Sequence, residues 1–173
     1  MTIGDTGTFT DPKDGQVYHW KVMKDGKKWM TSNYNFKSPQ SVCYDHNDAN
    51  ATEHGRLYLW SEVKNACPPG WRIPSQNEWY KLVWAYNTDD FRAIRDHLMK
   101  GKDSGFSITH SGFWAFERGF LGIGEDSVFW TSDKGGWEQG EGKLRWCFAV
   151  TNCASCPDVP EKNKYSCRFM ADE

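Results

Sequence analysis

The chain has little of what a membrane protein or a nucleic-acid binder needs. Its 173 residues contain no apolar run that approaches the roughly 20 residues of a transmembrane helix. Lysine and arginine total 21 against 23 aspartates and glutamates, so the formal net charge is −2. A chain so close to neutral lacks the counterion release that drives non-specific binding to nucleic acid. We therefore predict no membrane span and no nucleic-acid partner.

Aliphatic residues are also scarce, and aromatic residues take their place. Hydrophobic residues make up 38% of the chain, and 27 residues are aromatic (10 Trp, 10 Phe and 7 Tyr). Because each aromatic side chain buries roughly 150–250 Å², rings can stabilise a domain that has 16 glycines and many loops. The length fits a single domain over residues 1–173, and the composition favours an irregular, β-leaning fold.

Residues 1–7 lack the charged segment and apolar stretch of a signal peptide. The six cysteines are even in number, which favours partial use of disulfides in an oxidising setting. We expect an extracellular, cell-surface or virion location, reached either without a signal peptide or after its removal.

The first part of the chain predicts a hairpin and a loop. Strand-like segments on either side of residues 24–27 enclose an Asp-Gly pair, which predicts a β-hairpin with positive φ at both central positions. Residues 31–54 are polar and predict a long surface loop. Residues 55–60 fit either a buried strand or the first turn of a helix. Residues 67–74 contain three prolines and a glycine and predict no regular structure.

Helices are predicted next, followed by short strands. Ser75 and Glu78 have the spacing of a capping box, and apolar residues at helical spacing follow as far as Tyr86. A second helix over residues 89–99 ends near Gly101. Alternating apolar residues in 144–150 predict a half-buried strand, and further short strands are predicted at 106–108, 112–116, 127–132 and 165–170. The predicted fold class is α+β, with an N-terminal hairpin, two helices and a loop-rich antiparallel sheet.

Segments in this order resemble the Fibrobacter succinogenes major paralogous domain family. They are Asp11–Tyr18 with Trp29-Met30, Gly55–Trp60, Cys67–Ser75 with Glu78-Trp79, and Gly105-Phe106-Ser107 with Phe129–Ser132. The closing Tyr165-Ser166-Cys167-Arg168 is similar to the family's terminal strand, displaced by one residue. The resemblance covers nearly the whole chain.

The segment Gly70–Ser75 with Glu78-Trp79 also resembles a motif of formylglycine-generating enzymes and of the variable proteins of diversity-generating retroelements. Those proteins have the C-type lectin fold. The resemblance implies that the N- and C-terminal strands pair, and that a loop-rich upper sheet presents ligand-binding residues. The positions at which the family tends to carry cysteine imply a disulfide between Cys67 and Cys167.

The residues favour neither catalysis nor a metal or cofactor site. The nucleophile elbow, the phosphate loop and the HExxH motif are absent, and the five histidines are scattered. The sugar-binding motifs of calcium-dependent lectins are also absent, and the oxygen-rich segments 11–15 and 45–48 fit turns. Four cysteines could form a zinc set, but we favour disulfides or buried thiols for them: Cys147, Cys153, Cys156 and Cys167.

The C-terminal loops supply most of the candidate ligand-binding residues. Trp137 lies among four glycines, where it either folds back on the core or serves as an exposed aromatic anchor. Aromatic and adaptable polar side chains on a rigid sheet also make up antibody paratopes. In the variable proteins that the chain resembles, this region is the binding surface. The predicted ligand-binding residues are Trp137, Glu138, Gln139, Trp114, Phe116, Asn152, Asp158, Lys162 and Tyr165.

These observations predict a non-enzymatic module that binds a protein or glycan without a cofactor. It would act as a retroelement variable protein or as a surface or phage adhesin. A structural component of a surface layer or phage particle is the alternative, and a formylglycine-type oxidase is a third hypothesis.

Overall fold

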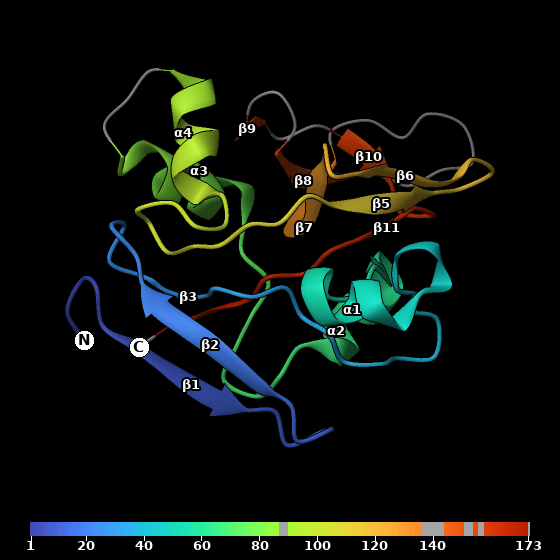
Figure 1. The fold of residues 1–173 in the computed structure, drawn as a ribbon, viewed down its shortest axis with the longest axis horizontal. Helices are drawn as coiled ribbons and strands as arrows, with labels where there is room; N and C mark the ends of the chain where they lie inside the picture. The colour runs from blue at the N-terminus through green and yellow to red at the C-terminus, as the bar shows by residue number, and fades with distance from the viewer. Residues whose placement is uncertain (87–89, 136–143, 151–153, 156–157, 173) are drawn as a thin grey trace.

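The computed structural model of the protein describes residues 1–86, 90–135, 144–150, 154–155 and 158–172. These residues form an α+β fold with two sheets, and the smaller sheet lies below the larger one in Figure 1. The smaller sheet has the order β1 (Thr6–Thr10), β2 (Val17–Val22), β3 (Lys28–Met30) and β12 (Met170–Ala171). Because β12 pairs with β3, the two ends of the chain lie side by side (Figure 1).

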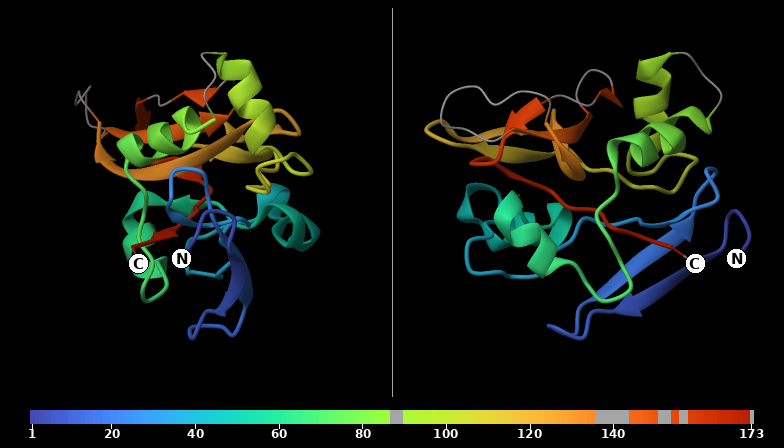
Figure 2. Two further views of the ribbon diagram at one scale, coloured as in Figure 1. Left: turned by 90° about the vertical axis from the view of Figure 1, so that its left-hand side faces the viewer. Right: turned by 180° about the vertical axis from the view of Figure 1, so that it is seen from behind.

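The larger sheet contains most of the late strands. Its order is β10 (Asp158–Pro160), β8 (Leu144–Val150), β7 (Ser127–Lys134), β5 (Ser111–Ala115), β11 (Lys164–Tyr165) and β4 (Tyr58–Leu59). In addition, β6 (Gly119–Ile123) pairs with β5, and β9 (Ala154–Ser155) pairs with β8. Figure 2 shows this sheet from two further sides, with the C-terminal segment running between the two layers.

The helices lie around these sheets. They are a 3₁₀ turn (Tyr44–His46), α1 (Asp48–His54), α2 (Trp60–Ala66), α3 (Gln76–Trp84) and α4 (Phe91–Leu98). Helices α1 and α2 lie beneath the β5–β11 end of the larger sheet, and α3 and α4 lie beside its other end (Figure 1). The capping box of α3 is confirmed, because the Ser75 side chain accepts from the Glu78 N–H and the Glu78 carboxylate accepts from the Ser75 N–H.

The aromatic residues build a core on both faces of strands β7 and β8. One cluster packs Trp79 of α3 against Phe129 and Phe148, and the other packs Trp130 against Trp60 of α2. In β8, Phe148 and Val150 face the first cluster, whereas Cys147 and Ala149 belong to the second. The prediction of a half-buried strand at 144–150 is therefore wrong for 147–150, which are buried on both faces.

The predicted hairpin is present as β2 and β3, although its turn differs from the expected one. Gly26 has a φ of 77°, whereas Asp25 does not have a positive φ. The Asp25 carboxylate instead accepts bonds from the Lys27 N–H (3.1 Å) and from the Trp29 indole (2.9 Å). This side-chain network fixes the turn with only one left-handed residue. Strand β1, which the sequence did not predict, pairs with β2 along its whole length.

The prediction of a long surface loop over residues 31–54 is also wrong. Asn47 caps α1 by accepting from the Ala49 N–H at 3.0 Å, and Gly55 caps the other end of the helix. Tyr34, in the same segment, is fully buried and its hydroxyl donates to the Ala66 carbonyl at 2.8 Å. The segment is thus folded onto the second cluster.

Other predictions are confirmed in part. Residues 55–60 supply both a strand and the start of a helix, because β4 is followed directly by α2. Residues 106–108 form no strand in the described structure and contribute only a bridge between Ile108 and Met99. Strand β6 was not predicted, and residues 165–170 divide into β11 and β12 with irregular backbone between them.

Arg72 ties the start of α3 to the end of the chain. Its guanidinium donates to the Glu78 carboxylate at 2.8 Å and to the Asp172 carboxylate at 2.7 Å. Hydrogen bonds from Arg72 lower the pKa of Asp172 below its ordinary value of 3.8. Burial alone would raise the pKa of Glu78, but hydrogen bonds from Arg72 and Ser75 outweigh burial and lower it below 4.5.

Replacing Arg72 with methionine should flatten the acid dependence of stability. Carboxylates with a lowered pKa in the folded state stabilise it above their ordinary pKa values, and this stabilisation is lost as the pH falls through the lowered values. The free energy of unfolding of Arg72→Met should therefore lie below that of the wild type at neutral pH and approach it as the pH falls through the lowered pKa values of Glu78 and Asp172. Urea titrations across this range measure the difference, with Arg92→Met as an exposed control. A difference in the free energy of unfolding between wild type and Arg72→Met that stayed constant with pH would contradict this role.

Candidate functional site

Four side chains on or next to β5 and β11 of the larger sheet form an aromatic and cationic surface. We name it the Phe116 surface, and it consists of Trp114, Phe116, Lys162 and Lys164. The Trp114 and Phe116 ring centroids are 6.3 Å apart. The Lys162 ammonium lies 5.0 Å from the Phe116 ring centroid, and the Lys164 ammonium lies 5.3 Å from that of Trp114. Phe116 is 45% exposed, so the surface offers an apolar ring next to positive charge.

Backbone pairing and one buried amide hold this surface in place. Lys164 of β11 is directly opposite Trp114 of β5 in the sheet register. Phe116 follows β5, and its N–H donates to the Asn163 Oδ1 at 2.9 Å. The Asn163 amide also donates to the Tyr165 hydroxyl at 2.7 Å. Because Asn163 is buried and bonded on both sides, the backbone that carries Phe116 is fixed.

A second set of contacts fixes the lysine over Trp114. The Lys164 ammonium donates to the Gln40 carbonyl at 2.7 Å, and the Gln40 N–H donates to the Glu62 carboxylate at 2.9 Å. Burial lowers the pKa of Lys164, and the charge of Glu62 opposes this effect. An ammonium held over an indole face contributes cation–π attraction. Lys164 is therefore part of the framework, whereas Lys162 is exposed and free to meet a ligand.

The structure brings together several of the residues that the sequence predicted as ligand-binding. Trp114, Phe116 and Lys162 lie on one surface. Asp158 begins β10, where it is opposite Trp146 in β8. The remaining predicted residues lie outside the described part of the chain: Trp137, Glu138, Gln139 and Asn152.

Tyr165 is only 3% exposed, so it supports the surface rather than contacting a ligand directly. Its ring packs edge-on against Trp130 with centroids 4.8 Å apart. The roles of Lys164 and Asn163 in this site were not predicted from the sequence. Strand β11 has only two residues, too few to show alternation, and the partner of Lys164, Trp114, is set by a long-range pairing that the sequence does not reveal.

Cys67 and Cys167, the predicted disulfide partners, are free thiols in the structure. Burial raises the pKa of Cys67 to about 12, and it raises the pKa of Cys167 as well, with the charge of Cys67 adding to the effect. Cys167 belongs to the second aromatic cluster, and Cys67 packs against that cluster. The thiolate is the reactive form of cysteine, so the half-buried Cys67 and the buried Cys167 are expected to oxidise slowly once the chain has folded.

We predict that the Cys67–Cys167 disulfide forms during oxidative folding and not afterwards. Folded, reduced protein treated with oxidised glutathione should keep both thiols free. Denatured, reduced protein refolded in a glutathione redox buffer should give linked peptides that contain both cysteines. Mass mapping without reduction measures this, and Cys67→Ser should abolish the linked species. Free thiols, or disulfides with other cysteines, after refolding would contradict the prediction.

Two further properties concern the described residues alone. None of their helices is long and apolar enough to cross a membrane. Among them, no three His, Cys, Asp or Glu side chains are grouped so that they could hold a metal ion. The alternative zinc set includes Cys153 and Cys156, which lie outside the described residues.

The fold and the surface together define an α+β domain with an aromatic-rich core and an exposed aromatic ring next to β5 of its larger sheet. A family model described as the Fibrobacter succinogenes major domain matches residues 16–169. The chain therefore belongs to this family, as its motifs predicted. No curated protein and no solved structure matches the chain.

Proposed function

We propose that the protein is a non-enzymatic binding module with a C-type-lectin-like fold, which recognises a protein or a glycan through the Phe116 surface and the predicted C-terminal loop residues. Such a module would act as a surface or phage adhesin or as the variable protein of a diversity-generating retroelement. The pairing of β12 with β3 and the capped helix that follows the Gly70–Ser75 motif support this fold.

The observation that supports the binding role best is the exposure of Phe116 on a fixed backbone. A large apolar ring left 45% exposed costs solvation free energy that burial in the core would avoid. Aromatic residues on rigid frames are enriched among the residues that dominate binding free energy. The ammonium of Lys162 over the ring adds a charge that a carboxylate or a ring hydroxyl of a partner could meet.

Arrays of proteins and glycans probed with the wild type and with Phe116→Ala test the proposal. The wild type should bind at least one class of ligand, and Phe116→Ala should lose most of that signal while keeping the wild-type unfolding midpoint. Trp137→Ala measures the contribution of the predicted loop residue on the same array. Empty arrays together with symmetric oligomers in solution would favour the structural component instead.

A further inference from the structure

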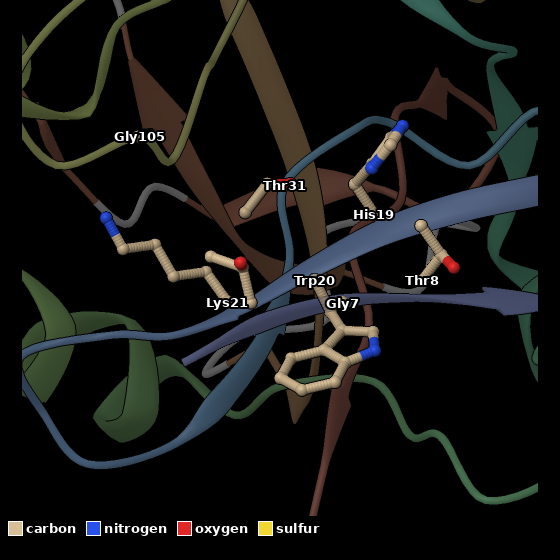
Figure 3. Close-up of a pocket in the computed structure, with 8 residues that line it drawn as sticks. Gly7, Thr8, His19, Trp20, Lys21, Thr31 and Gly105 are labelled. Atoms are coloured by element: carbon tan, nitrogen blue, oxygen red, sulfur yellow. The ribbon is translucent and has the colours of Figure 1, made fainter. Parts of the chain in front are cut away.

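A polar groove runs along the open face of the smaller sheet, on elements that take no part in the Phe116 surface. Its first cavity has a volume of about 490 Å³ and is lined by Thr6, Gly7 and Thr8 of β1, His19, Trp20 and Lys21 of β2, and Thr31 and Gly105. In Figure 3, Lys21 extends toward the loop that carries Gly105, and His19 and Thr8 lie at the opposite end. The Trp20 indole points to the other side of the strands (Figure 3).

A second cavity continues this groove. It has a volume of about 540 Å³ and lies between β2, α1 and the segment around Thr109. His19 and Thr31 line both cavities, so the two spaces adjoin at these residues. Each volume falls within the range of about 300–1,000 Å³ that is typical of ligand sites.

Hydroxyl and amide groups dominate the lining of the second cavity. They include the side chains of Gln16, Ser32, Asn33, Thr52, Ser107 and Thr109. Asn35 also lines this cavity, and within the described residues its buried Oδ1 has no hydrogen-bond partner. A buried acceptor without a partner costs stability unless a ligand or water donates to it. This chemistry suits a ligand that carries many hydroxyl groups.

The charges along the groove are mainly positive, although the whole chain has a net charge of −2. No described residue that lines the first cavity carries a carboxylate. The Lys21 ammonium there donates to the Ser104 carbonyl at 2.8 Å and forms no ion pair within the described residues. In the second cavity, the carboxylate of Glu53 is paired with Lys100 at 3.4 Å.

Gly105 makes room for the Lys21 ammonium. Its φ is 67°, and a Cβ atom at this position would lie 3.2 Å from the Lys21 Nζ. The ammonium is thus seated against bare backbone at the wall of the cavity, where its remaining N–H groups are available to an anion. Lysine binds anions as a compact point charge with three donors.

From this combination of hydroxyl-lined walls and unpaired positive charge we infer that the groove binds an acidic oligosaccharide of the uronic-acid type. The carboxylate of a sugar ring would meet Lys21, the ring hydroxyls would exchange hydrogen bonds with the threonine and serine side chains of the second cavity, and one hydroxyl would donate to the Asn35 Oδ1. This site does not depend on the Phe116 surface.

Isothermal titration with oligogalacturonate and with oligomannuronate tests the inference, and methyl-esterified oligogalacturonate removes the charge while keeping the sugar. At least one acidic oligomer should bind, and the ester should bind at least tenfold more weakly. Lys21→Gln should weaken binding at least tenfold, whereas replacement of Lys37, an exposed lysine that lines neither cavity, should change binding by less than twofold in Lys37→Gln. His19 lines both cavities, so His19→Ala should weaken binding. Its side chain is exposed and makes no hydrogen bond in the described structure, so the unfolding midpoint should not change.

Three results would overturn the inference. They are equal binding of acid and ester, equal effects of Lys21→Gln and Lys37→Gln, and the absence of binding to both acidic oligomers. Tighter binding of an oligothymidylate than of either oligomer would assign the groove to single-stranded nucleic acid instead. Phe116→Ala should leave oligouronate binding unchanged. The experiments therefore distinguish a wrong assignment of the groove from a wrong assignment of the Phe116 surface.

Discussion

Arg168→Met should lower the free energy of unfolding by about 3–5 kcal/mol. Arg168 is 1% exposed, and its guanidinium donates to the Asn33 Oδ1 at 2.8 Å, to the Ser107 carbonyl at 2.7 Å and to the Phe106 carbonyl. A methionine fills most of the space but leaves these three acceptors without donors, and each unsatisfied buried group costs about 1–3 kcal/mol.

The arginine is charged despite its burial. Burial lowers its pKa to about 9, which still leaves the guanidinium protonated at neutral pH. The Phe106 ring, with its centroid 4.6 Å from the guanidinium carbon, supplies cation–π attraction in place of a carboxylate. Arg168 thus joins the C-terminal segment to the loop at 106–107 through geometry that a lysine cannot reproduce.

Urea unfolding at neutral pH measures the loss of stability as a lower urea midpoint, with an unchanged dependence of the unfolding free energy on urea concentration. Arg168→Lys should be destabilised as well, because one ammonium cannot bond to all three acceptors, and Arg118→Met serves as the exposed control. Equal midpoints for Arg168→Met and Arg118→Met would show that the buried network contributes nothing.

Trp79→Ala should cost a similar amount, about 3–5 kcal/mol. Trp79 is fully buried and stacks on Phe148 with centroids 4.3 Å apart and planes 8° apart. It also packs against Trp29 with centroids 4.8 Å apart. Alanine would leave a cavity at the point where α3, the smaller sheet and the larger sheet meet.

Two variants separate packing from other effects. Trp79→Phe keeps most of the ring contacts and removes an indole N–H that is buried without a partner among the described residues, so it should cost only about 1–2 kcal/mol. Trp84→Ala, on the same helix, removes a ring that is 57% exposed and should change stability little. Thermal or urea unfolding of the three variants gives the ranking, and a loss for Trp84→Ala equal to that for Trp79→Ala would contradict it.

Local signals explain which parts of the fold the sequence predicted. Helix α3 was predicted because the capping box of Ser75 and Glu78 lies within one turn. Helix α1 was missed because its residues are polar, and its stability depends on the Asn47 cap and on contacts made by the rest of the chain. The burial of both faces of β8 was missed because Cys147 and Ala149 are small, and the cluster that covers them includes Tyr34 and Trp60 from distant segments.

The candidate site was predicted only in outline for the same reason. Trp114 and Phe116 were identified by residue type, and Lys162 by its place in a polar loop. The register that joins them depends on the pairing of β5 with β11, which are almost fifty residues apart in the chain. No local pattern encodes such a pairing, so the support from Asn163 and Lys164 became evident only in the folded structure.

The proposed binding role rests on Phe116, and an affinity comparison between matched aromatic variants tests it most directly. For a ligand found on the arrays, Phe116→Ala should raise the dissociation constant at least tenfold, the effect of losing a binding hot spot. Trp84→Ala removes a ring of greater exposure on another face and should stay within twofold. Equal dissociation constants for the two variants, with both chains folded, would contradict the assignment of binding to the Phe116 surface.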